Sequence, residues 1–244
     1  MYSKKILAIS SSRVGNSGYL ENAVPLIENF LRSEETKIAF LPFASADGNY
    51  EEYTNRIKDA LKKLPYSLKV VLPENAEEII AESDVLMTGG GNTFKLLHDI
   101  YALGILDIIR SKINAGTPYI GWSAGANITG ATIGTTNDMP VIQPKSFNAL
   151  GVFPFQINPH YVNIKKKGFN GETRDDRLKE FMIMNPGKSI IGLPEGTALK
   201  LYNNHLKFIG DVPGVLFFAK KGTGQIIREK VAHETDLTYL MQNI

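Results

Sequence analysis

A short apolar run leads directly into a serine between two glycines in the stretch Pro118-Tyr119-Ile120-Gly121-Trp122-Ser123-Ala124-Gly125-Ala126-Asn127. Residues 118–122 have the length and the apolar character of a buried strand, and a helix is expected to follow. In open α/β sheets, ligands bind beyond the carboxyl ends of the strands, which is where this pattern puts Ser123. The stretch therefore predicts an α/β sheet with Ser123 at its functional edge.

The same alternation extends from this stretch toward the N-terminus. Short apolar runs alternate with segments in which apolar residues recur at three- and four-residue spacing, as in parallel strands joined by crossover helices. Strands are predicted at residues 6–9, 38–41, 68–72 and 84–88, and helices at 20–31, 53–64 and 92–114, with a break at Gly104. The N-terminal part is thus expected to form a mostly parallel sheet flanked by helices.

The rhythm changes after Gly151. Residues 152–157 are expected to form a strand, 174–184 a helix and 190–193 another strand. Residues 198–202 and 206–209, separated by Asn203-Asn204, predict a β-hairpin, so that the chain ends in antiparallel strands. Because no internal repeat or linker interrupts the pattern, we expect one α/β domain over residues 1–244.

Composition limits the classes of function. With 43% apolar and 21% charged residues, the chain of 244 residues is expected to fold as an ordinary globular protein. The balance of 27 Lys and Arg against 25 Asp and Glu gives a net charge of +2, which does not favour nucleic acid as a partner. The absence of cysteine excludes disulfides, thiolate metal sites and a cysteine nucleophile.

Targeting and membrane signals are not evident in the sequence. The N-terminal apolar run at residues 6–9 is shorter than the roughly 7 to 15 residues of a signal-peptide core. No apolar stretch approaches the roughly 18 residues that are needed to span a bilayer. We therefore expect a cytoplasmic protein without a membrane partner.

Ser123 fits the G-x-S-x-G pattern of a nucleophile elbow. A sharp turn puts the serine backbone in a strained conformation, and glycines two residues on either side let strand and helix approach closely. The free amide of Ala124, at the start of the following helix, can then donate to a developing oxyanion. In the alternative interpretation, the serine only caps the helix.

A nucleophilic serine needs a base, and the chain has four histidines. His98 is expected within a helix, His205 in a hairpin turn and His233 in a polar stretch. His160 follows a predicted strand on a loop that Pro159 restrains, which suits a positioned base. The alternative is a loop histidine that bonds only to backbone groups.

Two loop carboxylates are candidates to orient the histidine. Glu195 stands at the end of a predicted core strand, at the same sheet edge as Ser123, whereas Asp138 lies on a longer loop whose path the sequence does not define. We favour Glu195 and leave Asp138 open. Either residue can alternatively be an ordinary turn carboxylate.

The glycine run Gly89-Gly90-Gly91 lies between a predicted strand and a predicted helix. It lacks the Lys-Ser/Thr pair of a Walker A loop and the G-x-G-x-x-G spacing, so it gives little support to nucleotide binding. Its amides can instead provide a second oxyanion donor. Since the chain has no His-Glu-x-x-His pair and no carboxylate cluster with metal-ligand spacing, we expect neither a metal nor a cofactor.

Five motifs stand in one order along the chain: Gly89-Gly90-Gly91-Asn92-Thr93-Phe94, Gly121-Trp122-Ser123-Ala124-Gly125-Ala126-Asn127, Thr135-Thr136-Asn137-Asp138-Met139-Pro140, Ile157-Asn158-Pro159-His160 and Gly192-Leu193-Pro194-Glu195-Gly196. Together they resemble peptidase E, the α-aspartyl dipeptidase family. The resemblance extends from the first strand to about Glu195 and includes Gly171-Glu172-Thr173-Arg174. The predicted hairpin and the tail beyond it match poorly.

The resemblance implies a metal-free serine dipeptidase that cleaves dipeptides with an N-terminal aspartate. It implies a fold related to class I glutamine amidotransferase-like domains. By this resemblance Ser123 is the nucleophile, His160 the base and Glu195 the third member of a triad, with oxyanion amides from Gly91 and Ala124. The motif of Asp138 also matches, so the identity of the third member stays open.

Arg174 belongs to a matched motif and is expected near the start of a helix, 14 residues after His160. A guanidinium can bind the side-chain carboxylate of a substrate aspartate with two parallel hydrogen bonds. The alternative is a solvated arginine that pairs with Asp175, Asp176 or Glu180.

Two other functions stay open at this point. One is a related peptidase that acts on another aspartyl polymer, similar to cyanophycinase, and the other is a catalytically silent binding protein of the same fold. A small peptide is the expected partner, and the sequence leaves the oligomeric state open.

Overall fold

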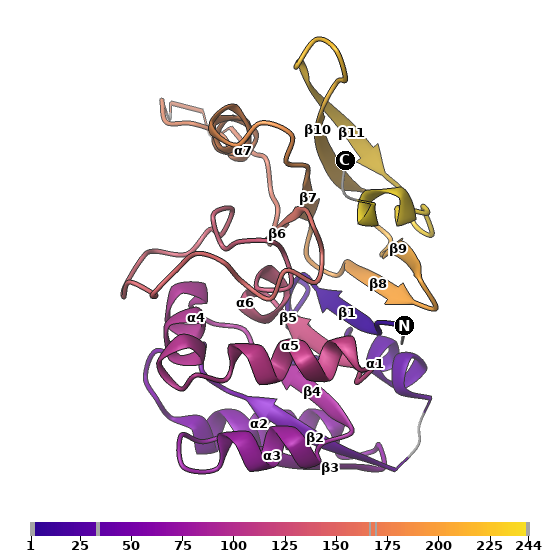
Figure 1. Ribbon diagram of the computed structural model, residues 1–244. Coiled ribbons are helices and arrows are strands. Elements are labelled where there is room, and N and C mark those ends of the chain that lie inside the picture. Colours follow the sequence, from indigo (N-terminus) through magenta and orange to yellow (C-terminus); the bar gives the residue numbers. More distant parts are fainter. Residues whose placement is uncertain (1–2, 33–34, 166, 169, 243–244) are drawn as a thin grey trace.

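The computed structural model describes residues 3–32, 35–165, 167–168 and 170–242. Its larger sheet has seven strands in the order β3-β2-β4-β5-β1-β8-β9 (Figure 1). The first five are parallel, and β8 and β9 continue the sheet in antiparallel pairing. The strands are β1 (Ile6–Ile9), β2 (Thr36–Leu41), β3 (Tyr66–Val70), β4 (Val85–Thr88), β5 (Tyr119–Trp122), β8 (Ala198–Tyr202) and β9 (His205–Ile209).

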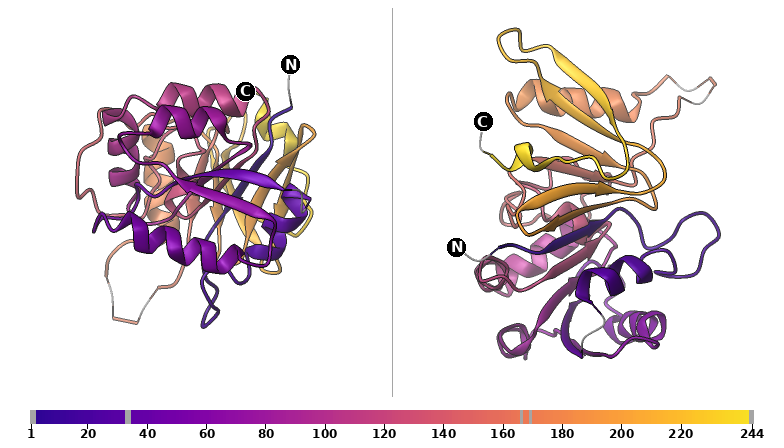
Figure 2. Two further views of the ribbon diagram at one scale, coloured as in Figure 1. Left: turned by 90° about the horizontal axis from the view of Figure 1, so that it is seen from below. Right: turned by 90° about the vertical axis from the view of Figure 1, so that its right-hand side faces the viewer.

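Helices cover both faces of this sheet (Figure 2). Successive residues of a strand point to opposite faces, and in β1 both sets are apolar: Leu7 and Ile9 join one core cluster, and Ile6 and Ala8 join another. The first cluster receives α1 (Val24–Leu31) and α2 (Tyr50–Leu61), and the second receives α3 (Ala76–Glu82), α4 (Thr93–Ala102), α5 (Leu106–Asn114) and the short α6 (Ala124–Asn127). Burial on both faces explains why the strands are continuous apolar runs.

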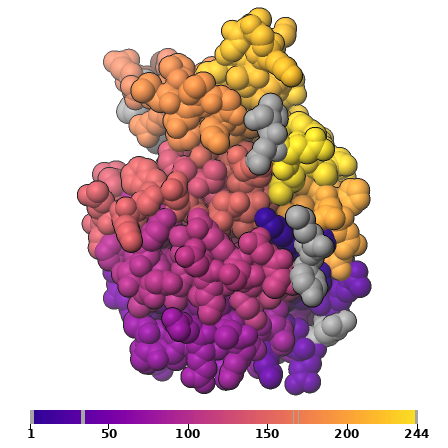
Figure 3. Space-filling model, in the orientation of Figure 1, coloured from indigo at the N-terminus to yellow at the C-terminus, as the bar shows by residue number. Residues whose placement is uncertain are grey.

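A second sheet has four strands in the order β11-β10-β7-β6. They are β6 (Gln156–Pro159), β7 (Ile190–Leu193), β10 (Gly214–Ala219) and β11 (Ile226–Val231), and only β6 and β7 are parallel. Helix α7 (Arg174–Met184) packs on this sheet through Leu178 and Met182, and the 3-10 helix η1 (Thr238–Met241) follows β11. In Figure 3 the C-terminal segments, in orange and yellow, form the top of the molecule and the upper part of its right-hand side.

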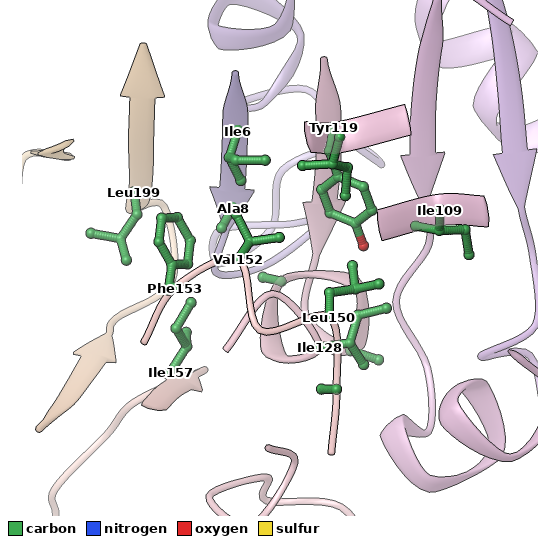
Figure 4. Packing of buried hydrophobic residues seen from close by; sticks show 14 of the residues in the cluster. Ile6, Ala8, Ile109, Tyr119, Ile128, Leu150, Val152, Phe153, Ile157 and Leu199 are labelled. Carbon is green, nitrogen blue, oxygen red and sulfur yellow. The ribbon is translucent and has the colours of Figure 1, made fainter. Parts of the chain in front are cut away.

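The two sheets share one apolar core. Figure 4 shows Ile6, Ala8 and Leu199 of the larger sheet beside Val152, Phe153 and Ile157 of the segment that leads into β6 and of β6 itself. These side chains belong to the same buried cluster, which also includes Ile191 and Leu193 of β7 and Leu216 of β10. The carboxyl ends of β5, β6 and β7 are therefore held together from within.

Most predicted elements are confirmed. Strands β1 and β7 and helix α7 have the predicted bounds, and Gly104, with φ of 68°, separates α4 from α5 as predicted. The chain ends in antiparallel strands, and the β8–β9 hairpin turns at Asn203-Asn204 as predicted. The fold is thus α/β with a mostly parallel sheet flanked by helices. No helix in the described part of the chain is both long and apolar enough to cross a membrane.

Several predicted bounds differ from the structure by up to three residues, such as β3 at 66–70 for the predicted 68–72 and α2 at 50–61 for the predicted 53–64. Two predicted starts differ by more. Helix α1 begins at Val24 and not at residue 20, because Leu20 adopts φ of 57°, outside the helical region, and Pro25 suits the first helical turn. The strand predicted at 152–157 begins only at Gln156. The backbone groups of Phe153 and Phe155 bond to the loop at residues 129–131 and not to a neighbouring strand.

Candidate active site

Ser123 stands in a sterically enforced turn between β5 and α6. Its backbone has φ of 53° and ψ of −113°, a conformation that non-glycine residues rarely adopt. A Cβ on Gly121 would lie 2.2 Å from the carbonyl oxygen of Gly125, and a Cβ on Gly125 would lie 2.2 Å from that of Thr88. Gly121 therefore allows the close approach of β5 and α6 that the elbow pattern predicts, and Gly125 allows α6 to approach the end of β4.

His160 follows β6 and faces Ser123 across the junction of the two sheets. Its Nε2 lies 3.0 Å from the Oγ of Ser123. Its backbone has φ of 50°, and its amide donates to the hydroxyl of Ser10, which in turn donates to the carbonyl of Leu193. The side-chain amide of Asn137 donates to the carbonyl of Pro159. These bonds fix the loop that presents the imidazole.

Glu195 follows β7 of the smaller sheet, so the expectation that it shares a sheet edge with Ser123 is wrong, and its carboxylate lies on the other ring nitrogen of His160. Its Oε1 is 2.9 Å from Nδ1, and the two side chains are 51% and 41% exposed, for Glu195 and His160 respectively. In the tautomer with the proton on Nδ1, this nitrogen donates a hydrogen bond to the carboxylate of Glu195, and Nε2 can accept one from the hydroxyl of Ser123. The geometry is that of a linked serine, histidine and carboxylate.

Asp138 takes a different position. Its Oδ2 accepts from the backbone amide of Thr93, 2.7 Å away, and from the hydroxyl of Thr136, 3.1 Å away. Thr93 is the first residue of α4, so the carboxylate also complements the positive end of that helix. Among the two carboxylates that the sequence left open, the structure brings Glu195 and not Asp138 to His160.

The two residues expected to supply oxyanion amides lie near Ser123: Ala124 follows it in the chain, and Gly91 lines a cavity that Ser123 also lines. Ala124 is the first residue of α6, where an amide has no acceptor within the helix. The glycine run presses against the serine, because a Cβ on Gly90 would lie 2.9 Å from the Cβ of Ser123. Gly91 has φ of 139°, and a Cβ there would lie 2.2 Å from the carbonyl oxygen of Ala44. Glycine is therefore required at this position.

Ser123 and His160 line two cavities. The smaller, of about 210 Å³, is polar and includes Asn137, Asp138 and Arg174. The larger, of about 500 Å³, has an aromatic wall and one guanidinium, from Arg56. Ser123 and His160 therefore have space for a ligand on two sides.

Arg174 is the first residue of α7 and reaches the smaller cavity. A capping box formed by Thr173 and Asp176 fixes the start of this helix. Burial lowers the pKa of Arg174, and the nearby charge of Arg177 lowers it further. In the described part of the chain Arg174 forms no salt bridge, since Asp175 pairs with Arg228 and Asp176 bonds to Thr173. The structure therefore does not show the surface ion pair that was the alternative for this arginine.

Several residues around the site carry no sequence motif. Ser10 links the loop of His160 to β7, and it follows the first predicted strand directly, so the rule that sites form beyond strand ends could have identified it. Arg228 pairs with Asp175 through Nε and Oδ2, 2.9 Å apart, from a strand more than 50 residues away along the chain. No local pattern marks such a pair.

Comparison with known proteins gives one family. The model of peptidase family S51 matches residues 6–209. This range includes the β8–β9 hairpin, so the expectation that the resemblance ends at about Glu195 is wrong. Peptidase E of Haemophilus influenzae (strain PittGG) is 45% identical over 216 residues, which cover 88% of this chain and 92% of that protein. Peptidase E of Nostoc sp. (strain PCC 7120) is 44% identical over 216 residues, which cover 88% and 89%.

Two solved structures share the fold. A chain from Listeria monocytogenes EGD-e described as a peptidase E protein superposes with a TM-score of 0.59 at 22% identity, over 94% of this chain and all of that one. A peptidase from an acI-B1 actinobacterium superposes with a TM-score of 0.64 at 18% identity, over 95% and 96%. The mixed α/β architecture is therefore that of these structures and is consistent with a class I glutamine amidotransferase-like fold.

Proposed function

Because this chain belongs to peptidase family S51 and is a serine-type peptidase, we propose that it hydrolyses dipeptides with an N-terminal aspartate through Ser123, His160 and Glu195. The observation that carries the proposal is the double engagement of His160, with Nε2 at 3.0 Å from the hydroxyl of Ser123 and Nδ1 at 2.9 Å from the carboxylate of Glu195. A catalytically silent binding protein is no longer an alternative for a member of this family.

The first half of the reaction forms an acyl-enzyme. Nε2 of His160 takes the proton of Ser123 as Oγ attacks the substrate carbonyl, and Glu195 stabilises the imidazolium. The amides of Gly91 and Ala124 donate to the oxyanion of the tetrahedral intermediate. The carbon–nitrogen bond then breaks, the proton on Nε2 passes to the leaving amine, and aspartate remains esterified to Ser123.

The second half of the reaction releases aspartate. Water gives a proton to Nε2 of His160 and attacks the ester carbon, again with the two amides holding the oxyanion. The bond between the carbon and Oγ breaks, and Nε2 returns its proton to Ser123. No metal takes part in either half of the proposed reaction.

The smaller cavity suits the aspartyl residue. Arg174, which forms no salt bridge with the residues that the structure describes, brings its guanidinium into this cavity, where it can bind the side-chain carboxylate in a partly dehydrated space. The α-ammonium group of the same residue needs an anionic acceptor, and Asp138 is the carboxylate on this wall. A volume of about 210 Å³ leaves little room for a chain that continues beyond the first residue.

A substrate panel tests the proposal. Purified protein is incubated with Asp-Leu, Leu-Leu and a β-aspartyl dipeptide, and the released leucine is measured. We expect Asp-Leu to be cleaved with the highest kcat/KM. A preference for the β-aspartyl dipeptide would instead support a peptidase similar to cyanophycinase.

Substitution of Arg174 tests how aspartate is recognised. We expect Arg174→Met to lower kcat/KM for Asp-Leu at least about tenfold, because a charged hydrogen bond contributes roughly 1.5 to 3 kcal/mol. Slow hydrolysis of an uncharged analogue should barely change. Arg177→Met, on the same helix but outside the cavity of Ser123, is the matched control. Equal losses on both substrates would show that Arg174 supports the fold and does not bind the aspartate.

A further inference from the structure

The larger cavity beside Ser123 has no role in the recognition of aspartate described above. It shares Ser123 and His160 with the smaller cavity, but its other walls come from α2, from Trp122 at the end of β5 and from the loops after β1, β2 and β4. If the first residue of a dipeptide occupies the smaller cavity, as the proposed function holds, the leaving residue occupies the larger one. Its volume of about 500 Å³ can accept a large side chain.

Three aromatic side chains form the wall nearest the core. Tyr53 donates to the carbonyl of Gly90 at 2.9 Å, the hydroxyls of Tyr19 and Tyr53 are 3.2 Å apart, and Nε1 of Trp122 lies 3.2 Å from the hydroxyl of Tyr19. The polar atoms therefore satisfy one another. Burial raises the pKa of Tyr19 and of Tyr53, so both hydroxyls are neutral at physiological pH. This wall is uncharged and suits an apolar side chain.

Arg56 of α2 stands above this aromatic wall. Its guanidinium carbon lies 5.4 Å from the ring centre of Tyr53 and 5.9 Å from that of Tyr19, and its side chain is 49% exposed. Its ion pair with Glu52 is long, with Nε and Oε1 3.9 Å apart, and Glu52 also accepts from the side chain of Asn49. Among the described residues the guanidinium makes no closer polar contact.

The other charged wall residue does not neutralise this cation by direct contact. Asp47 uses Oδ1 to accept from the hydroxyl of Ser45 at 2.7 Å and from the amide of Asn49 at 3.0 Å. These two hydrogen bonds lower the pKa of Asp47, and the charge of Arg56 lowers it further. The carboxylate is thus held by its own loop, and the donors of Arg56 stay available to a ligand.

We propose that Arg56 binds the free α-carboxylate of the leaving residue, so that the larger cavity recognises the C-terminus of a dipeptide. The inference rests on the proposed function for the orientation of the substrate. A planar guanidinium held over aromatic rings presents paired donors to a carboxylate with little loss of side-chain freedom. A longer peptide or a C-terminal amide puts a neutral group at the same place and loses the charge-assisted hydrogen bonds. Recognition at both ends then restricts the enzyme to dipeptides.

The test compares a dipeptide with its own C-terminal amide. Wild type, Arg56→Met and Arg56→Lys are assayed on the free-acid and amide forms of Asp-Leu and of Leu-Leu. We expect wild type to prefer the acid by about tenfold or more in kcat/KM, mainly through KM. Arg56→Met should abolish this preference, because it lowers kcat/KM for the free acid and leaves kcat/KM for the amide within about twofold of wild type. Arg56→Lys should restore part of the preference.

The matched control is Arg32→Met. The guanidinium of Arg32 lies over the ring of Tyr202 at the same distance of 5.4 Å, and neither residue lines the larger cavity. This variant should keep the wild-type ratio of acid to amide. An unchanged ratio in Arg56→Met, with folding verified by circular dichroism, would overturn the inference.

The same data separate the two proposals. If wild type cleaves Leu-Leu better than Asp-Leu, the proposed aspartate specificity fails, and the ratio of acid to amide on Leu-Leu decides whether Arg56 binds the carboxylate. If wild type prefers Asp-Leu but cleaves acid and amide equally, the proposed function holds and the role of Arg56 is wrong.

Discussion

The two sheets contribute to the active site in different ways. The larger sheet presents Ser123 at the end of β5 through contacts so close that hydrogen is the only side chain allowed at Gly121 and Gly125. The smaller sheet presents His160 and Glu195 after β6 and β7 through hydrogen bonds, on side chains that are 41% and 51% exposed. Packing thus holds the nucleophile, and polar contacts hold the base, so the two halves should respond differently to substitution.

The largest expected effect on kcat comes from removing the reactive side chain that each sheet presents, Ser123 on the larger and His160 on the smaller. Ser123→Ala and His160→Ala should each lower kcat by about 10⁶, because a nucleophile and its base act as one unit. Single-turnover assays on Asp-Leu with protein from separate preparations can measure such a loss. Equal losses mean that the unit spans both sheets. A Ser123→Ala protein with a tenth of the wild-type activity would show that another residue is the nucleophile.

The carboxylates give the next largest effect. Glu195→Gln should lower kcat by about 10⁴ with little change in KM, because an amide does not stabilise the imidazolium and favours the wrong tautomer. Asp138→Asn is the matched control within the site, since Asp138 lines the smaller cavity but bonds to Thr93 and not to His160. It should raise KM and leave kcat within several-fold. A larger loss of kcat in Asp138→Asn than in Glu195→Gln would make Asp138 the third member.

The steric side of the comparison is tested at Gly125. In Gly125→Ala the added methyl group clashes with the carbonyl oxygen of Thr88 at the end of β4. Because this oxygen belongs to the backbone, it can move only with the strand, so β4 and α6 must separate. We expect a free energy of unfolding lower by about 1 to 3 kcal/mol. A displacement of about 1 Å at Ser123 should lower kcat by about 10².

Gly18→Ala is the control for this substitution. The nearest atom to a Cβ at Gly18 is an oxygen of the flexible Glu21 side chain, at 3.1 Å. Urea unfolding and activity should both stay near wild type in the control. Wild-type activity in Gly125→Ala would contradict the view that packing alone sets the conformation of Ser123.

The sequence predicts this site well wherever a reactive residue follows an apolar strand directly. Ser123 does so, and His160 and Glu195 follow their predicted strands after a few residues, so local patterns place each of them beyond a strand end. These patterns do not show that Ser123 lies on the larger sheet and that His160 and Glu195 lie on the smaller one. Asp138 lies in a long irregular segment, whose path depends on bonds to distant residues such as Asn92 and Pro159. The sequence therefore could not decide between the two carboxylates by reasoning on the residues alone.

The sequence also did not predict that the strands divide into two sheets. The apolar residues 152–155 resemble a strand, yet they are buried under the larger sheet, and their backbone bonds to a loop. Apolar character reports burial, and only pairing partners distinguish a strand from a packed loop. The contact between β11 and α7 could not be predicted either. It is made by the ion pair of Arg228 and Asp175, and no local sequence pattern marks these two residues as partners.

That pair leads to the smallest expected effect. Tyr161 and Asp175 directly follow His160 and Arg174, and the hydroxyl of Tyr161 bonds to the carboxylate of Asp175. Arg228 of β11 joins them, with Nε 2.9 Å from Oδ2 of Asp175 and a terminal nitrogen 3.2 Å from the hydroxyl of Tyr161. Strand β11 lies beyond residues 6–209, the range matched by the family model. The C-terminal hairpin of β10 and β11 therefore supports the smaller cavity from outside the range that the family model matches.

Arg228→Met should weaken this support without touching the substrate. The side chain of Asp175 is only 12% exposed, but it keeps its bond to Tyr161, so we expect a loss of about 1 kcal/mol in the free energy of unfolding. KM for Asp-Leu should rise about threefold at unchanged kcat, because Arg174 shifts while Ser123, held by packing in the other sheet, does not. Lys230→Met, on the same strand, is the control. A fall in kcat with constant KM would mean that the displacement reaches His160, and the two halves would then not be independent.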